Sequence, residues 1–438
     1  MLKIFDLSLK LNGFPIEDAK RKLSEIISVN EQDFAAFLDL RKKEIVKYHL
    51  QNNSFYKTIN NSSISDSWFE IPIMKKSDFQ KPLKERLSIG YNIDSIYVNK
   101  TSGSSGDPFV FGKDKFCHAL IWANIMRRFG MYGIDFNHSF QARFYGMPLD
   151  FKANKILRLK DSLSNRYRFN IFDLSDKGLA KITEGFRKKK FDYINGYTSS
   201  IVMLAKYLKK ENIILKDICP TLKVCIVTSE MLFDDDKTLL ENQFNVPVVN
   251  EYGASELDVI AFQDPKDDWL VNSETLFVEI LGDDNQPVPN GVEGKIVITS
   301  LYNFAHPMIR YEVGDYGILD EKSTAKKPLL KKLIGRTNDF AILPSGKKPA
   351  GMTFYSITKK LFNDDGNVKE FVIKQTKLDT FEIEYTSERP LTSYEIEAIK
   401  KVLDQYLETG LHYIFHRRDK LKRGENGKLK QFVSLIKP

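Results

Sequence analysis

The sequence predicts an α/β protein with a large N-terminal domain of βαβ units and a small C-terminal α+β domain. Between Val98 and Ser300, short apolar segments of strand type alternate with segments of helical periodicity. A cleanly alternating segment, Phe381–Tyr385, and an amphipathic helix, Leu391–Leu407, come much later in the chain. The length of 438 residues also exceeds what one ordinary core accommodates. We therefore expect an N-terminal domain over 1–334 and a C-terminal domain over 341–438.

The N-terminal part of the large domain, about 1–97, is predicted to be mainly helical. An apolar face begins at Phe34, Phe37 and Leu38 and continues through Ile45, while lysine and arginine occupy much of the other face. An irregular polar stretch follows at 60–67.

The central part of the chain is predicted to form parallel βαβ units. The candidate strands of these units are Phe191–Asn195, Val224–Thr228 and Val246–Asn250, and the candidate helices are Ser200–Lys210 and Asp235–Gln243. A further short strand is predicted at Ser95–Asn99, directly before the segment Thr101–Pro108. Two further strands, Leu276–Leu281 and Lys295–Thr299, are joined by a turn-rich connection and are expected to pair antiparallel.

The boundary between the domains is placed near Gly335–Asp339, within a hinge at 335–340. In the C-terminal domain, Ile396, Ile399 and Leu403 share one face of the predicted helix. Thr392 and Glu395 form a candidate capping box at its start.

Charge and cysteine content exclude several classes of protein. The net charge of +8 is spread over many lysines, which favours a solvated surface over a nucleic-acid groove. The cysteines Cys117, Cys219 and Cys225 fit no disulfide framework or metal spacing, so we expect a reducing compartment. No apolar run reaches the roughly 18 residues of a membrane span, and no signal-peptide core is seen. The expected location is cytoplasmic.

The segment Thr101–Pro108 is the strongest local indication of function. It combines hydroxyl residues with two glycines directly after a predicted strand. Glycines let a backbone approach an anion closely, and hydroxyl and N–H groups donate hydrogen bonds to phosphate oxygens. A flexible connector is the alternative. A P-loop kinase or ATPase is disfavoured, because Gly106 is followed by Asp107 and Pro108 and not by lysine.

Further segments follow this loop in a fixed order. They are Tyr252–Glu256, Arg310–Asp315, Gly335–Asp339 and the pair Gly427–Lys428. The ordered set resembles the adenylate-forming superfamily, which includes acyl-CoA synthetases, peptide-synthetase adenylation domains and luciferases.

Within that superfamily the chain is similar to the phenylacetate-CoA ligase branch, including CapK-type proteins of capsule biosynthesis. The segments that carry this similarity are Arg41–Tyr56, which ends in Ser-Phe-Tyr, and Ile71–Lys76. The resemblance covers essentially the whole chain, and it implies that the small C-terminal domain is mobile.

The resemblance assigns a role to each candidate residue. It implies that Glu256 binds Mg²⁺, that Tyr252 lies against adenine and that Asp315 binds the ribose hydroxyls. Lys428, or Lys430 two residues later, approaches the α-phosphate of ATP during adenylation. Asp339 lies at the hinge, and Tyr145 and Tyr197 line the acid pocket. The remaining nucleotide-binding candidates are Thr101, Ser102, Gly103, Ser104, Ser105, Gly106, Ser229, Glu230, Gly253, Ser255 and Arg336. Arg310 is expected either to touch the nucleotide or to pair with a neighbouring acid.

The implied activity is a two-step ligation that uses ATP and Mg²⁺. A small carboxylic acid becomes an acyl-AMP with release of pyrophosphate, and the acyl group then passes to coenzyme A or to an amine. Transfer to an amine corresponds to a CapK-like amide-forming ligase in surface polysaccharide synthesis. A non-catalytic nucleotide-binding protein is the remote alternative, and a homodimer is expected from the resemblance alone.

Overall fold

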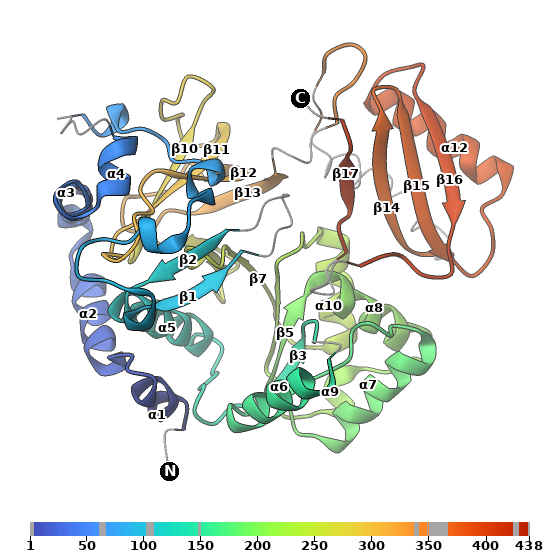
Figure 1. Cartoon of the computed structure of the whole chain (residues 1–438). Helices are drawn as coiled ribbons and strands as arrows, with labels where there is room; N and C mark the ends of the chain where they lie inside the picture. The colour runs from blue at the N-terminus through green and yellow to red at the C-terminus, as the bar shows by residue number, and fades with distance from the viewer. Residues whose placement is uncertain are drawn as a thin grey trace. The chain divides into compact units, whose positions relative to one another are not determined.

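The computed structural model describes residues 4–60, 67–101, 109–147, 150–336, 341–347, 349, 367–423 and 429–436. The chain forms two compact units (Figure 1). Unit 1 comprises Met1–Leu232 and Asp236–Leu333, and unit 2 comprises Phe233–Asp235 and Ile334–Pro438. The predicted mixed α/β architecture is confirmed.

The chain begins with helices, as predicted. On α3 the side chains of Phe34, Leu38 and Ile45 are buried, which is the apolar face expected from the sequence. Asn53 separates α3 from α4 and caps α4 by accepting a hydrogen bond from the Tyr56 N–H. Across the described residues, no helix is long and apolar enough to cross a membrane. The helices are α1 (Ile4–Leu11), α2 (Ile16–Ser28), α3 (Glu31–Asn52) and α4 (Ser54–Ile59).

A seven-stranded sheet forms the centre of unit 1, in the order β4-β3-β5-β6-β7-β8-β9. The first five strands are parallel, and β8 and β9 continue the sheet antiparallel. The predicted strands at Val224–Thr228 and Val246–Asn250 correspond to β6 and β7. The strands are β3 (Gln141–Phe144), β4 (Arg166–Arg168), β5 (Tyr193–Tyr197), β6 (Val224–Thr228), β7 (Val248–Gly253), β8 (Val259–Gln263) and β9 (Trp269–Val271).

Helices cover both faces of this sheet (Figure 1). On one face, apolar side chains of α7 (Asp176–Lys188) and α8 (Thr198–Lys210) pack against Ala142, Ile194 and Val227. On the other face, Tyr193, Ile226 and Val249 join the core that includes α5 (Lys115–Gly130) and α2. The other helices between strands are α6 (Phe151–Leu163), α9 (Leu215–Ile218) and α10 (Asp234–Phe244).

Two smaller sheets complete unit 1. The strands β1 (Tyr97–Lys100) and β2 (Val110–Lys113) pair antiparallel on either side of the predicted phosphate loop. The other sheet has the order β10-β11-β12-β13, and its first pair is the antiparallel pair expected from the sequence. Its strands are β10 (Leu276–Leu281), β11 (Glu293–Ser300), β12 (Tyr311–Leu319) and β13 (Leu330–Arg336).

Unit 2 is a small α+β structure with a sheet in the order β16-β15-β14-β17. Ile399 and Leu403 of the helix α12 (Ser393–Tyr406) share one core with Ile373 and Phe381 of the sheet. The predicted capping box is present, with Thr392 and Glu395 each bonded to the backbone N–H of the other. The strands are β14 (Val368–Lys377), β15 (Thr380–Ser387), β16 (His412–Arg417) and β17 (Phe432–Ser434).

Candidate functional site

Two tyrosine–carboxylate hydrogen bonds join the segment that carries the predicted metal residue to the strand that carries the predicted ribose residue. The Tyr252 hydroxyl, at the end of β7, donates to Asp315 Oδ2 on β12 at 2.7 Å. The Tyr311 hydroxyl, at the start of β12, donates to Glu256 Oε1 just after β7 at 3.2 Å. Each segment thus supplies one tyrosine and one carboxylate, so the turn that carries Glu256 is tied to the strand that carries Asp315 by reciprocal contacts. Tyr311 was not singled out from the sequence.

Tyr252, which the resemblance places against adenine, is buried. Its side chain lies in the core with Phe109, Phe111 and Tyr311, and only 8% of the residue is exposed. The ring position is therefore fixed by packing, while the hydroxyl orients Asp315. Its contact with adenine stays a prediction.

A buried lysine that the sequence reading missed supports the turn that carries Glu256. Lys113, the last residue of β2, donates from Nζ to the carbonyl oxygens of Ser255 at 3.0 Å and Leu257 at 2.6 Å. Burial lowers the pKa of Lys113, and the nearby Asp258 opposes this effect. Burial likewise raises the pKa of Asp258 to about 6, against the effect of Lys113. The signal in the sequence was a lone lysine that ends an apolar strand.

Thr101 closes the base of the predicted phosphate loop. Its N–H donates to the carbonyl of Phe109 at 3.0 Å, and its hydroxyl oxygen accepts the Phe109 N–H at 3.0 Å. Thr101 therefore fixes the two ends of the loop against each other, immediately after β1. The loop residues Ser102, Gly103, Ser104, Ser105 and Gly106 lie outside the described residues.

Ser229 and Glu230 follow β6 at the carboxyl edge of the parallel strands. Ser229 has a φ of 70°, a left-handed conformation that costs energy for a residue with a side chain. The Glu230 carboxylate accepts the Ser199 N–H at 2.7 Å, at the N-terminus of α8. A carboxylate is favourable at that end of a helix, so Glu230 joins β6 to α8. Contact of either residue with adenine stays a prediction.

The aromatic pair assigned to the acid pocket is brought together by the structure. The rings of Tyr145 and Tyr197 lie edge to face with centroids 5.0 Å apart. The Tyr145 hydroxyl donates to Asn195 Oδ1 at 2.8 Å. Both tyrosines follow or end neighbouring parallel strands, β3 and β5.

Arg310 has a structural role, one of the two outcomes considered from the sequence. Its residue is 1% exposed and its Nη2 lies 3.3 Å from Glu279 Oε1. Its Nη1 donates to the carbonyl oxygens of Phe69 at 2.9 Å and Ile71 at 2.8 Å. Arg310 therefore fastens the Ile71–Lys76 segment to the start of β12.

The remaining candidates cannot be placed. Arg336 ends β13, but its side chain is not among the described ones, and Asp339 and Lys428 lie outside the described residues. Lys430 is exposed. The choice between Lys428 and Lys430 stays open.

The chemistry of Glu256 fits a magnesium ion held beside phosphate groups. In the described residues, no group of three or more His, Cys, Asp or Glu side chains could hold a metal ion by itself. Mg²⁺ is usually bound by one or two carboxylates together with phosphate oxygens and waters. Glu256 is partly exposed, and a carboxylate that accepts one bond from Tyr311 retains further lone pairs for a cation.

Solved structures that superpose on this chain identify its fold. The chain superposes on 2-hydroxyisobutyryl-CoA ligase in the postadenylation state, bound to an acyl-AMP, with a TM-score of 0.70 and 17% identity. That match covers 93% of this chain and 90% of the ligase. The chain has the adenylate-forming fold. The resemblance inferred from the ordered segments is therefore confirmed at the level of the fold.

Two more comparisons, one of structure and one of sequence, found similar proteins. The amide bond synthetase McbA from Marinactinospora thermotolerans matches with a TM-score of 0.53 and 13% identity, over 76% of this chain and 68% of McbA. In sequence, the chain is 23% identical over 348 residues to Protein CapK of Staphylococcus aureus. That alignment covers 73% of this chain and 70% of CapK. No protein-family model matches the sequence.

Replacing Tyr252 by phenylalanine tests the link between Tyr252 and Asp315. The variant keeps the buried ring and removes the donor to the Asp315 carboxylate. Hydrogen bonds to charged groups contribute more than neutral ones, so we expect about tenfold weaker ATP binding by calorimetry. Tyr56→Phe is the matched control, because Tyr56 lies in the same core and its buried hydroxyl has no hydrogen-bond partner in the described structure. Equal effects of both substitutions would show that Tyr252 acts through packing alone.

Replacing Lys113 by methionine tests the support of the Glu256 turn. The substitution preserves the length of the side chain but leaves the Ser255 and Leu257 carbonyls and Asp258 without the ammonium. We expect the free energy of unfolding to fall by about 3 kcal/mol, measured by urea denaturation, because one partner of a buried charged group is lost. A loss below about 0.5 kcal/mol, the range of ordinary surface substitutions, would contradict this role.

Proposed function

We propose that this protein activates a small carboxylic acid with ATP and Mg²⁺ and then transfers the acyl group to an acceptor. In the first step a carboxylate oxygen bonds to the α-phosphorus of ATP, the bond to the β-phosphate breaks, and pyrophosphate leaves with the electron pair. In the second step a nucleophile attacks the acyl carbonyl and AMP leaves. The products are an acyl-acceptor conjugate, AMP and pyrophosphate.

The observation that carries this proposal is the reciprocal pair of bonds that holds Glu256 and Asp315. Two carboxylates near an anionic triphosphate would repel it unless each has a specific task. A carboxylate accepts two hydrogen bonds from a cis-diol, which suits Asp315 to the ribose. Glu256 suits a hard cation, and the loop Ser102–Gly106 suits the terminal phosphates.

In the first step the carboxylate of the acid must approach the α-phosphate of ATP, although both groups are negatively charged. Backbone N–H groups and hydroxyls of the phosphate loop would hold the triphosphate in line for attack, and Lys428 would offset the charge that develops at the α-phosphate. A bound Mg²⁺ would supply neutralisation of the phosphate oxygens. The reciprocal tyrosine bonds hold the carboxylates in position before the nucleotide arrives.

The acceptor in the second step is either coenzyme A or an amine. The phenylacetate-CoA ligase resemblance supports a thioester product. The 23% identity with CapK supports an amide-forming ligase acting on an amino sugar or amino acid in surface polysaccharide synthesis. We propose a cytoplasmic enzyme in either case.

Acid-dependent exchange of pyrophosphate into ATP tests the first step. A panel of carboxylic acids is offered with MgATP, and exchange above the no-acid control is expected for at least one member. Binding of ATP without exchange for any acid would instead support the non-catalytic nucleotide-binding alternative.

Mass spectrometry of the products separates the two acceptors. The acid that supports exchange is incubated with MgATP and either coenzyme A or a set of amino sugars and amino acids. A thioester identifies coenzyme A as the acceptor, and an amide identifies an amine.

A further inference from the structure

A partly exposed arginine lies where the parallel strands of the large sheet end. Arg143 is on β3, and its register partners are Arg168 on β4 and Asn195 on β5. Along β5, the face that carries Asn195 also carries Tyr193, which belongs to the core with α5. Along β5 this face therefore changes from apolar to polar toward the carboxyl end, and on β3 and β4 it carries polar residues at both levels, with Gln141 and Arg166 in register with Tyr193. In open α/β sheets, ligands bind at that edge.

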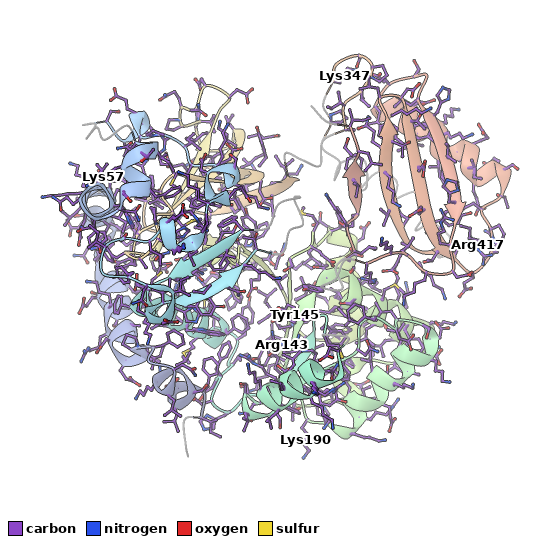
Figure 2. The ribbon with its side chains drawn as sticks, in the orientation of Figure 1. Lys57, Arg143, Tyr145, Lys190, Lys347 and Arg417 are labelled. Carbon is purple, nitrogen blue, oxygen red and sulfur yellow. The ribbon has the colours of Figure 1, made fainter. Side chains whose placement is uncertain are left out.

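The two side chains that contact the Arg143 guanidinium are uncharged. Its guanidinium carbon lies 4.7 Å from the centre of the Tyr145 ring, and its Nη1 donates to Gln141 Oε1 at 3.3 Å. Its Nε is buried and has no hydrogen-bond partner in the described structure. Arg143 on β3 and Tyr145, which follows that strand, are labelled in Figure 2. A guanidinium has five N–H donors, so most of its hydrogen-bonding capacity is unused by these contacts.

Among the described residues, no carboxylate forms an ion pair with Arg143. Asp161, which acts on it electrostatically, is paired with Arg168 at 2.8 Å. Glu251 on β7 also interacts with Arg143 at longer range, but burial raises the pKa of Glu251 to about 7. Arg166 adds a second positive charge nearby, and its guanidinium lies over the Phe5 ring without an ion pair in the described structure.

Burial lowers the pKa of Arg143 to about 10, an effect that Arg166 increases. Arginine still remains charged at neutral pH, and an unpaired charge that is partly withdrawn from water is costly to keep. The residue as a whole is partly exposed, so a small molecule can reach it. An anion that binds to Arg143 beside Tyr145 and Tyr197 would offset the energetic cost of this unpaired charge.

We propose that the acid activated by this protein carries a second anionic group, and that Arg143 binds it. The inference rests on the proposed acid-activating function. One carboxylate reacts with ATP, and the guanidinium fork of Arg143 holds a carboxylate, phosphate or sulfonate at the other end of the molecule. Tyr145 stacks on the guanidinium and keeps it oriented, while Asn195 fixes the Tyr145 hydroxyl. Arg143 is thus a residue that determines substrate specificity.

Matched pairs of acids test this proposal in the pyrophosphate exchange assay. Each pair has the same chain length, and one member ends in a methyl group while the other ends in a carboxylate, a phosphate or a sulfonate. Spanning chain lengths of about three to eight carbons covers the unknown spacing. We expect the anionic member of at least one pair to be preferred about 100-fold in kcat/KM. The preferred terminal group shows whether the second anionic group is a carboxylate, a phosphate or a sulfonate.

The variant Arg143→Met removes the charge and keeps much of the side-chain volume. It is expected to lower kcat/KM for the preferred anionic acid about 100-fold and to change that for the methyl-ended partner less than threefold. Arg143→Lys should retain part of the preference, because it keeps the charge but loses the planar fork. Arg166→Met is the matched control and should change neither acid more than threefold. Thermal unfolding of each variant checks that the fold is intact.

A binding measurement gives a readout that is independent of turnover. Non-hydrolysable acyl-sulfamoyl adenosines with and without the terminal anion are titrated into wild type and Arg143→Met by calorimetry. Wild type should bind the anionic analogue about 100-fold more tightly, and the variant should bind both alike.

The outcomes separate this inference from the proposed function. If exchange occurs but methyl-ended acids are preferred and Arg143→Met is unaffected, the inference is wrong and the ligase function stands. If Arg143→Met lowers activity equally with every acid, Arg143 has a structural role in the sheet and binds no anion. If neither exchange nor analogue binding is seen with any acid, the proposed function itself fails, and this inference with it.

Discussion

Lys428→Ala is expected to lower the rate of acyl-adenylate formation about 1000-fold, while ATP binding changes little. The loss of one preorganised group at a developing negative charge typically costs two to three orders of magnitude in rate, roughly 100- to 1000-fold. An ammonium at the α-phosphate acts mainly in the transition state, where the pyrophosphate is leaving. Single-turnover pyrophosphate release measures the rate, and calorimetry measures the affinity for ATP.

Lys430→Ala is the matched control for this prediction. Both lysines belong to the same segment, and only Lys428 follows a glycine. If Lys430→Ala shows the large loss and Lys428→Ala does not, the assignment belongs to Lys430. If neither variant slows the step, the C-terminal lysine has no part in adenylation.

Glu256→Gln is expected to lower kcat/KM for MgATP about 100-fold and to raise the Mg²⁺ concentration needed for half-maximal exchange. The amide oxygen of glutamine still accepts the Tyr311 hydroxyl, so the turn keeps its position while the charge is removed. Mg²⁺ prefers carboxylate oxygen over a neutral amide, which is the physical reason for the loss. Exchange rates measured over a range of Mg²⁺ concentrations test it.

Tyr311→Phe provides the comparison for the Glu256 prediction. It removes the hydrogen bond to Glu256 and leaves the carboxylate charge, so we expect a loss of about tenfold or less. An unchanged Mg²⁺ requirement in Glu256→Gln would show that this carboxylate is no metal ligand.

The structural elements that were predicted correctly are those that depend on a local pattern of residues in the sequence. The strand Val224–Thr228 is a short apolar run that is buried on both faces, and β6 occupies the same residues. The capping box of α12 depends on residues three apart. The order of the motifs along the chain identified the fold. Each motif is recognisable from its own residues, without knowing which distant residues it contacts.

The contacts that make the candidate site join residues distant in the sequence. Tyr252 and Asp315 are 63 residues apart, Tyr311 and Glu256 are 55 apart, and Lys113 and Ser255 are 142 apart. Sequence alone showed that these residue types suit a nucleotide, but it gave no reason to pair a tyrosine with each carboxylate. Arg143 was missed for a related reason. Its lack of an acidic partner becomes evident only when the neighbouring strands are in register.

Transfer of ¹⁸O from the acid substrate to AMP is the most direct test of the central claim, that a carboxylate attacks the innermost phosphorus of ATP. The acid that supports exchange is labelled in its carboxylate and carried through both steps with its acceptor. The account predicts one ¹⁸O atom in the phosphate of AMP and none in pyrophosphate. Label in orthophosphate with formation of ADP, or no label in AMP when product forms, would contradict it.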